Sequence, residues 1–249
     1  MNFLVTGGAG FIGSNFVKTI LDNNNSVVNL DSLSYAGSKK TIENLSKNNK
    51  NIFFKCNIGD KNKTAKILKK YKPQIIVNFA AETHVDRSIN NPDEFIETNI
   101  LDTYKFINTV KEYWEKLNNN KKRIFKFIHV STDEVYGDKK KGSSQETDQI
   151  ISSSPYSASK AAAEQIFLSY FRTYNFPVII TRSSNNYGPY QFPEKLIPLT
   201  LINALEGKNI NIYGNGEQVR NWIYVDDNNK ALIQIIKKGK LGEIYNIGG

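Results

Sequence analysis

The first residues of the chain decide its fold, and they read NFLVTGGAGFIGS (residues 2–14). Their apolar opening predicts a buried strand, Gly7, Gly10 and Gly13 follow it, and a helical apolar pattern begins at Phe11. Glycines in this context permit a tight turn and let the backbone approach a pyrophosphate. The N-terminus of the following helix offers free N–H groups to phosphates. The stretch therefore predicts the strand–turn–helix unit that binds a dinucleotide.

The second predicted strand indicates which dinucleotide. It spans 26–30 and leads to Asp31, whose carboxylate suits the hydroxyls of an adenosine ribose. No arginine stands at 32–35 to meet a ribose phosphate. This pattern favours NAD over NADP.

Further strands and helices alternate along the chain. Strands are predicted at 52–56, 74–79, 123–130 and 177–181, and helices at 37–47, 60–71, 92–117 and 156–174. This alternation predicts an α/β fold with a Rossmann-like, doubly wound parallel sheet.

The alternation loosens after residue 188. The remaining predicted elements are strands at 210–213, 219–225 and 244–247 and helices that start at 193 and span 226–238. We therefore predict an NAD-binding Rossmann domain that carries the catalytic residues at 1–182. A smaller, incomplete substrate-binding region follows at 183–249, and some of its elements return to the first domain.

Small or polar residues follow five of the predicted strands. They are the glycine loop, Asp31, and the segments 80–88, 131–136 and 182–189. A doubly wound parallel topology brings all these strand ends to one edge of the sheet. The sequence therefore predicts one shared ligand site.

The fifth predicted strand leads to Thr132, Asp133 and Glu134, a hydroxyl and two carboxylates. Downstream, Tyr156 and Lys160 stand one turn apart on one face of a predicted helix. A nearby ammonium and a positively charged nicotinamide would lower the pKa of the phenol. We therefore expect Tyr156 to be the base for an alcohol that loses hydride, with Thr132 bound to the same oxygen.

Asp133 and Glu134 extend this redox chemistry. Once a sugar carbon is oxidised to a ketone, the neighbouring C–H becomes acidic. One carboxylate can take that proton while the other, kept protonated, donates a proton to a departing hydroxyl. The alternative interpretation of the pair is a solvated acidic turn.

Composition excludes several other classes of protein. The 249 residues are 39% hydrophobic and contain one cysteine, Cys56, which rules out an internal disulfide and suits a reducing cytoplasm. No apolar run has the roughly 20 residues that span a bilayer, and the N-terminus lacks the features of a signal peptide. The net charge of +9 comes from scattered lysines without a basic stripe, so we expect no nucleic-acid or membrane partner. No cluster suggests a metal site.

Together these residues resemble the extended short-chain dehydrogenase/reductase superfamily and, within it, the dTDP-glucose 4,6-dehydratases. The matching stretches span essentially the whole chain, and they are 6–14, 80–89, 131–137, 156–160, 184–199 and 220–225. The Thr-Asp-Glu triplet and the run 185–196 are the specific ones. Asn57, Thr83 and Asn221 depart from the usual residues of the family, which also continues well past Gly249.

The resemblance implies a reaction cycle on dTDP-glucose. Tyr156 deprotonates the sugar 4-hydroxyl as hydride passes from C4 to NAD, and Lys160 holds the ribose and tunes Tyr156. Glu134 takes the C5 proton, Asp133 protonates the leaving 6-hydroxyl, and the hydride returns to C6. The product is a 4-keto-6-deoxy sugar.

The predicted ligand residues follow from the motifs and this resemblance. The predicted NAD site comprises Gly7, Gly10, Phe11, Ile12, Gly13, Asp31, Ser34, Asn57, Ile58, Phe79, Ala80, Ala81, Thr83, Thr98, Tyr156, Lys160 and Asn186. The predicted substrate site comprises Thr83, His84, Thr132, Asp133, Glu134, Asn185, Glu194, Lys195, Leu196, Tyr213 and Arg220. The family also implies a homodimer that forms through the helices at 92–117 and 156–174.

Two other functions remain open at this point. One is a different NAD-dependent nucleotide-sugar epimerase or decarboxylase of the same superfamily, against which the Asp133–Glu134 pair argues. The other is a dinucleotide-sensing regulator that has lost catalysis, against which the presence of all five catalytic residues argues.

Overall fold

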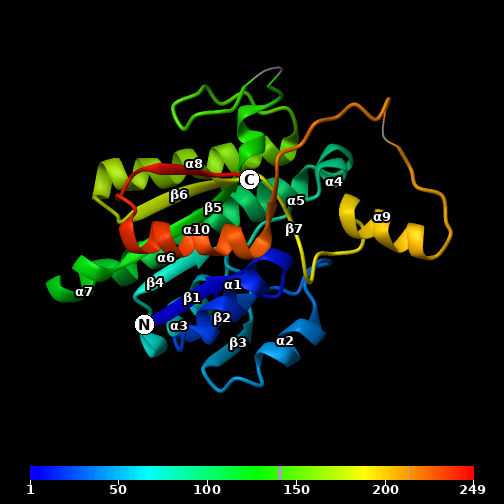
Figure 1. Ribbon diagram of the computed structural model, residues 1–249. Coiled ribbons are helices and arrows are strands. Elements are labelled where there is room, and N and C mark those ends of the chain that lie inside the picture. The colour runs from blue at the N-terminus through cyan, green and yellow to red at the C-terminus, as the bar shows by residue number, and fades with distance from the viewer. Residues whose placement is uncertain (140–141, 213) are drawn as a thin grey trace.

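A parallel seven-stranded sheet forms the centre of the computed structural model, which describes residues 1–139, 142–212 and 214–249 (Figure 1). Its strands are β1 (Asn2–Thr6), β2 (Ser26–Asp31), β3 (Asn51–Lys55), β4 (Ile75–Asn78), β5 (Lys126–Thr132), β6 (Val178–Ser183) and β9 (Ile244–Ile247). They are ordered β3-β2-β1-β4-β5-β6-β9, and each pairs with its neighbour in parallel. This order confirms the predicted Rossmann-like, doubly wound sheet.

Helices surround the sheet. They are α1 (Phe11–Asp22), α2 (Lys39–Leu45), α3 (Lys61–Tyr71), α4 (Val85–Asn90), α5 (Asp93–Phe95), the π-helix η1 (Ile96–Asp102), α6 (Thr103–Glu115), α7 (Asn119–Ile124), the 3₁₀-helix η2 (Asp133–Tyr136), α8 (Pro155–Tyr174), α9 (Leu196–Leu205) and α10 (Val225–Lys238). A second, two-stranded parallel sheet pairs β7 (Asn185–Tyr187) with β8 (Trp222–Tyr224).

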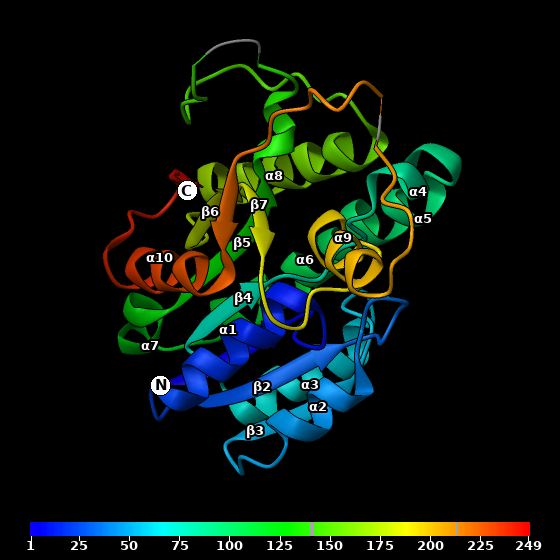
Figure 2. The ribbon, with the colours of Figure 1, turned by 45° about the vertical axis from the view of Figure 1, so that its right-hand side comes forward.

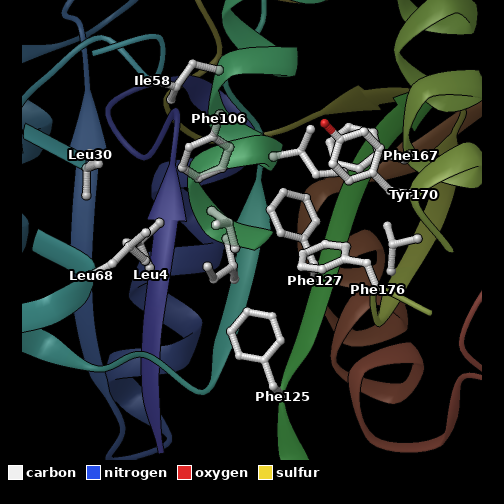
Figure 3. Packing of buried hydrophobic residues seen from close by; sticks show 14 of the residues in the cluster. Leu4, Leu30, Ile58, Leu68, Phe106, Phe125, Phe127, Phe167, Tyr170 and Phe176 are labelled. Atoms are coloured by element: carbon white, nitrogen blue, oxygen red, sulfur yellow. The ribbon is translucent and has the colours of Figure 1, made fainter. Parts of the chain in front are cut away.

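The two faces of the main sheet bury separate apolar clusters. Because successive strand residues point to opposite faces, Leu4 of β1 packs on one side and its neighbours Phe3 and Val5 on the other. Helices α3, α6 and α8 cover the Leu4 side, where Phe127 and Phe167 stack closely (Figure 3). Helices α1 and α10 cover the other side. Both faces are covered, as expected for a parallel sheet.

Three predicted elements have clearly different limits or regularity in the structure. The strand predicted at 123–130 begins at Lys126 and runs on to Thr132, because residues 123–124 close helix α7. The helix predicted at 92–117 is interrupted by the π-helical turn η1. The strand predicted at 219–225 is limited to β8.

The strand predicted at 210–213 is wrong over residues 210–212, and Tyr213 lies outside the described residues. Ile212 is 75% exposed, so its apolar side chain has no sheet to pack on among those residues. Helix α9, just before this segment, has no buried residue and stands away from the sheet (Figures 1 and 2).

Candidate active site

A cavity of about 1140 Å³ opens along the carboxyl ends of β1, β2, β4, β5 and β6. This is where ligands bind in open α/β sheets. Every predicted site residue that the structure describes lines this cavity; Tyr213 lies outside the described residues. Residues from the first strand to Arg220 therefore meet in one place.

The glycine loop forms the floor of the cavity at the start of α1. A Cβ added to Gly13 would lie 2.2 Å from the carbonyl oxygen of Gly7, and one added to Gly7 would lie 2.7 Å from the backbone nitrogen of Ala80. Gly7 also has a φ of +70°, which a side chain disfavours. Gly10 caps α1 without a side-chain hydrogen bond, and no acidic residue stands in the first turn. The helix start is thus built to receive an anion such as a pyrophosphate.

Asp31 ties this loop to the end of β2. One of its carboxylate oxygens accepts the N–H of Ala9 at 2.9 Å, and the other accepts the N–H of Leu33 at 2.7 Å. Burial raises the pKa of Asp31, and these two backbone donors act in the opposite direction. The carboxylate keeps free lone pairs on the cavity side for hydroxyl donors.

The Thr132–Glu134 stretch turns directly from strand into 3₁₀-helix. The Thr132 hydroxyl accepts the backbone N–H of Glu134 at 3.2 Å and so caps η2. Burial raises the pKa of Asp133, and the hydrogen bond from the Thr132 hydroxyl lowers it. Both carboxylates are half-buried and face the cavity.

Glu134 shares this environment. Burial raises its pKa, and the negative charge of Asp133 raises it further. The positive charges of Arg220 and Lys195 oppose that rise, so both cations lie near Glu134. Burial in turn lowers the pKa of Lys195.

Helix α8 presents Tyr156 and Lys160 from its first two turns. Ser154 and Ser157 form a capping box, and Pro155 stands in the first turn, so the helix start is strongly defined. Tyr156 is 7% exposed and packs edge-on against the Phe95 ring at 6.4 Å.

The pKa values of this pair differ from the sequence-based expectation. Burial raises the pKa of Tyr156 far above its usual range, and the charges of Glu134 and Asp133 add to the rise. The Lys160 ammonium donates to the carbonyl oxygen of Val130 at 2.7 Å. Burial lowers the pKa of Lys160 to about 8.

The segment at 189–195 is attached to the nucleotide-binding side of the cavity. The side-chain amide of Asn15 donates to the carbonyl of Pro189 at 2.8 Å, and the Phe192 ring meets Tyr35 at 5.7 Å. Glu194 lies 3.8 Å from Nε2 of His84. These contacts hold the segment that carries the predicted substrate residues Glu194 and Lys195 against the cavity.

Known proteins resemble the chain over its whole length. The family model described as GDP-mannose 4,6 dehydratase matches residues 4–249. The dTDP-glucose 4,6-dehydratase 1 of Escherichia coli (strain K12) is 48% identical over 100% of this chain and 72% of its own length. The dTDP-glucose 4,6-dehydratase of Xanthomonas campestris pv. campestris (strain B100) is 48% identical over 99% of this chain and 71% of its own.

The chain belongs to the dTDP-glucose 4,6-dehydratase family. The solved dTDP-glucose 4,6-dehydratase of Streptomyces venezuelae, which has NAD bound, superimposes with a TM-score of 0.93 at 41% identity, over 100% of this chain and 76% of that one. A UDP-glucose 4-epimerase from Thermotoga maritima superimposes at 0.88 with 31% identity, over 100% of this chain and 77% of that one. The fold is thus shared with epimerases, while the dTDP-glucose 4,6-dehydratase family has the higher identity.

Sequence reasoning missed several residues of this dTDP-glucose 4,6-dehydratase family member. Tyr35 and Glu82 line the cavity, and both stand within segments that follow predicted strands, 32–35 and 80–88, so their position was a usable signal. Asn99 had no such signal. It lies in the π-helical turn, donates to the Ser159 hydroxyl at 2.8 Å and bonds the backbone of Glu82, which ties α8 to the loop after β4.

The described residues form neither a metal site nor a membrane-spanning helix. No group of three or more His, Cys, Asp or Glu side chains lies close enough to hold a metal ion. No helix in that part of the chain is long and apolar enough to cross a bilayer.

Proposed function

We propose that this chain is a hydro-lyase that converts dTDP-glucose to dTDP-4-keto-6-deoxyglucose and water with NAD as its cofactor. The observation that carries this proposal is the placement of Asp133 and Glu134 beside Tyr156 and Lys160 in one cavity. A redox pair alone supports an alcohol–ketone interconversion. Two half-buried carboxyl groups next to it add the acid and the base that an elimination of water needs.

The cavity fits NAD by its shape and donors. The glycine loop, in which a Cβ at Gly7 or Gly13 would collide with backbone, can take a pyrophosphate at the start of α1. Asp31 stands at the end of β2 for the ribose hydroxyls. When bound, NAD would accept the hydride that leaves C4 and return it to C6 after water has left, and it would place a positive charge near the phenol.

The protein side chains then handle the protons. Tyr156 takes the proton of the sugar 4-hydroxyl, with Thr132 bonded to the same oxygen. Glu134 takes the C5 proton, which the neighbouring ketone acidifies. The C6–O bond breaks as Asp133 donates its proton to the leaving hydroxyl, and water departs. Burial raises the pKa of Asp133, which helps it keep that proton. Glu134 then returns a proton to C5 as C6 receives the hydride, which completes the 4-keto-6-deoxy sugar.

The remaining assignments belong to the same proposal. Residues 1–182 would hold NAD and the catalytic groups, and residues 183–249 would supply substrate contacts from Asn185, Glu194, Lys195, Leu196 and Arg220. A homodimer would form through the helices at 92–117 and 156–174. Ile96, Leu101 and Tyr104 support it, because 43–45% of each of these large side chains is exposed there. We propose a cytoplasmic location, which suits the free thiol of Cys56.

Mass spectrometry of the nucleotide sugar tests this function. The enzyme is incubated separately with dTDP-glucose, UDP-glucose and GDP-mannose, and we expect dTDP-glucose to lose one water with the highest kcat/KM. An unchanged mass with altered stereochemistry would instead identify an epimerase. Bound NAD without any turnover would identify a regulator.

A further inference from the structure

A buried ionic cluster lies behind the acid–base residues. Arg182 of β6 is 2% exposed, and its Nε and Nη2 donate to both carboxylate oxygens of Glu164 on α8 at 2.6–3.1 Å. Glu164 is fully buried. Nη1 of Arg182 donates to the hydroxyl of Tyr136 at 2.7 Å, and the guanidinium lies 4.6 Å from the centre of that ring. We call these three residues the Arg182 cluster.

The cluster joins the two elements that carry the chemistry. Glu164 follows Lys160 by one turn on α8, the helix that also carries Tyr156. Tyr136 is the last residue of η2, which starts with Asp133 and Glu134. The guanidinium of Arg182 therefore contacts both α8, which carries Tyr156 and Lys160, and η2, which starts with Asp133 and Glu134.

Tyr136 extends the connection to the far edge of the sheet. Its hydroxyl donates to the side-chain oxygen of Asn246 in β9 at 2.8 Å. The backbone N–H of Asn246 in turn donates to Glu146 at 2.8 Å. The end of η2 is thus held by directional bonds on both sides of the Tyr136 hydroxyl.

Stability does not explain an ion pair at this position. The desolvation cost of burying two charges is comparable to their attraction, and apolar replacements of equal volume often stabilise a protein. An apolar contact already exists here, because Ala161 of α8 packs on Val135 and Tyr136 of η2. The planar, bidentate guanidinium adds what that contact lacks, which is a fixed direction and distance.

We propose that Arg182 is a positioning residue that holds η2 against α8. Asp133 and Glu134 then contact the substrate in the correct geometry relative to Tyr156 and Lys160. This inference rests on the proposed dehydratase function. It predicts that loosening the cluster impairs the elimination step more than the oxidation step, because Tyr156 and Lys160 stay on their own rigid helix. A misplacement of about 1 Å at a reacting group can cost about a hundredfold in rate.

Tyr136→Phe tests the proposal with the smallest change, because it removes both hydroxyl bonds and keeps the ring under the guanidinium. Arg182→Lys is the second variant, since it keeps the charge and loses the planar fork. The matched control is Tyr113→Phe, which removes another half-buried hydroxyl, bonded to the carbonyl of Pro73 at 3.1 Å. The measurements are kcat and KM, the absorbance of reduced NAD during turnover, and amide hydrogen exchange.

We expect both cluster variants to lose about 10- to 100-fold in kcat with KM within about twofold, and to accumulate reduced NAD at steady state. Amide exchange over 131–137 should speed up relative to β1 in both cluster variants. Tyr113→Phe should keep the wild-type kcat and its exchange over 131–137.

Wild-type kcat and wild-type exchange over 131–137 in folded Tyr136→Phe and Arg182→Lys would overturn the positioning role. Faster exchange without accumulation of reduced NAD would also overturn it. The elimination step would then not be slowed relative to the oxidation step, and the cluster would only stabilise the fold. If the proposed dehydratase function is wrong, the wild-type enzyme itself will release no water from the nucleotide sugar. The exchange measurement still tests the geometry in that case.

Discussion

Burial and the charges of Glu134 and Asp133 raise the pKa of Tyr156 and so oppose its ionisation, while the hydrogen bond with Thr132 favours it. Its role as a base therefore depends on positive charge that arrives with the ligands and on the hydrogen bond from Thr132. Sequence context correctly placed Tyr156 and Lys160 in the cavity. It could not predict the direction of the pKa shift, because that depends on the burial of the phenol and on the charges of Glu134 and Asp133.

Tyr156→Phe tests this assignment. We expect kcat to fall about a thousandfold, since the phenol that takes the proton is gone, while the melting temperature stays unchanged. Steady-state kinetics and calorimetry provide the readouts. Tyr71→Phe, which removes a hydroxyl outside the cavity, where the ring packs against Phe54, is the control and should keep its activity. A loss below about threefold in Tyr156→Phe would exclude Tyr156 as the base.

Lys160 predicts a pH dependence of stability. Its pKa is about 8 in the folded protein, against an ordinary value of 10.5. Between these values the unfolded chain binds the proton and the folded chain does not, so stability rises with pH across this window. Relative to Lys160→Met, the wild type should gain on the order of 1–3 kcal/mol in unfolding free energy from pH 8 to 10.5.

Chemical unfolding of both proteins over this pH range measures the difference. Subtracting the two curves removes the titrations that they share. A difference that is flat between pH 8 and 10.5, or that falls, would contradict a depressed pKa for Lys160.

At the scale of elements, the strand–helix alternation was predictable because apolar periodicity reports burial directly. The limits of elements were less predictable where tertiary contacts decide them. Residues 96–102 have ordinary helical spacing, yet Asn99 is buried between Glu82 and Ser159 and the turn is π-helical. The Arg182 cluster had no local signal either, since its members come from three separate elements.

The glycine loop makes an element-scale prediction. Gly13→Ala should destabilise the fold by about 1–3 kcal/mol, because the added Cβ meets the Gly7 carbonyl at 2.2 Å. Gly10→Ala meets the same carbonyl only at 3.4 Å, so it should fold normally and bind NAD about tenfold more weakly or worse. Calorimetry and titration with NAD separate the two effects. Wild-type NAD affinity in Gly10→Ala would show that the pyrophosphate does not approach this glycine.

At the scale of the whole molecule, the order of the sheet brings five strand ends to one cavity. Parallel topology made that convergence predictable. The position of 196–212 was not predictable, because the apolar sequence of α9 reads like core, whereas Leu201 and Leu205 are 59% and 88% exposed.

The proposed dimer makes a prediction at this scale. Leu101→Glu places a charge among the exposed apolar side chains of η1 and α6, so we expect it to yield a monomer in sedimentation velocity. Leu205→Glu on α9 adds the same charge at an exposed apolar residue and should remain dimeric. A dimer that survives Leu101→Glu unchanged would place the interface elsewhere.

We propose that the enzyme dehydrates a nucleotide sugar and that Glu134 removes the proton at C5. Turnover of dTDP-glucose in deuterated water, followed by mass spectrometry, tests it most directly. We predict a sugar that has lost one water and gained one deuterium at C5, and a decrease of about a hundredfold or more in this rate for Glu134→Gln. A sugar recovered intact or epimerised, without deuterium, would exclude dehydration through removal of the C5 proton.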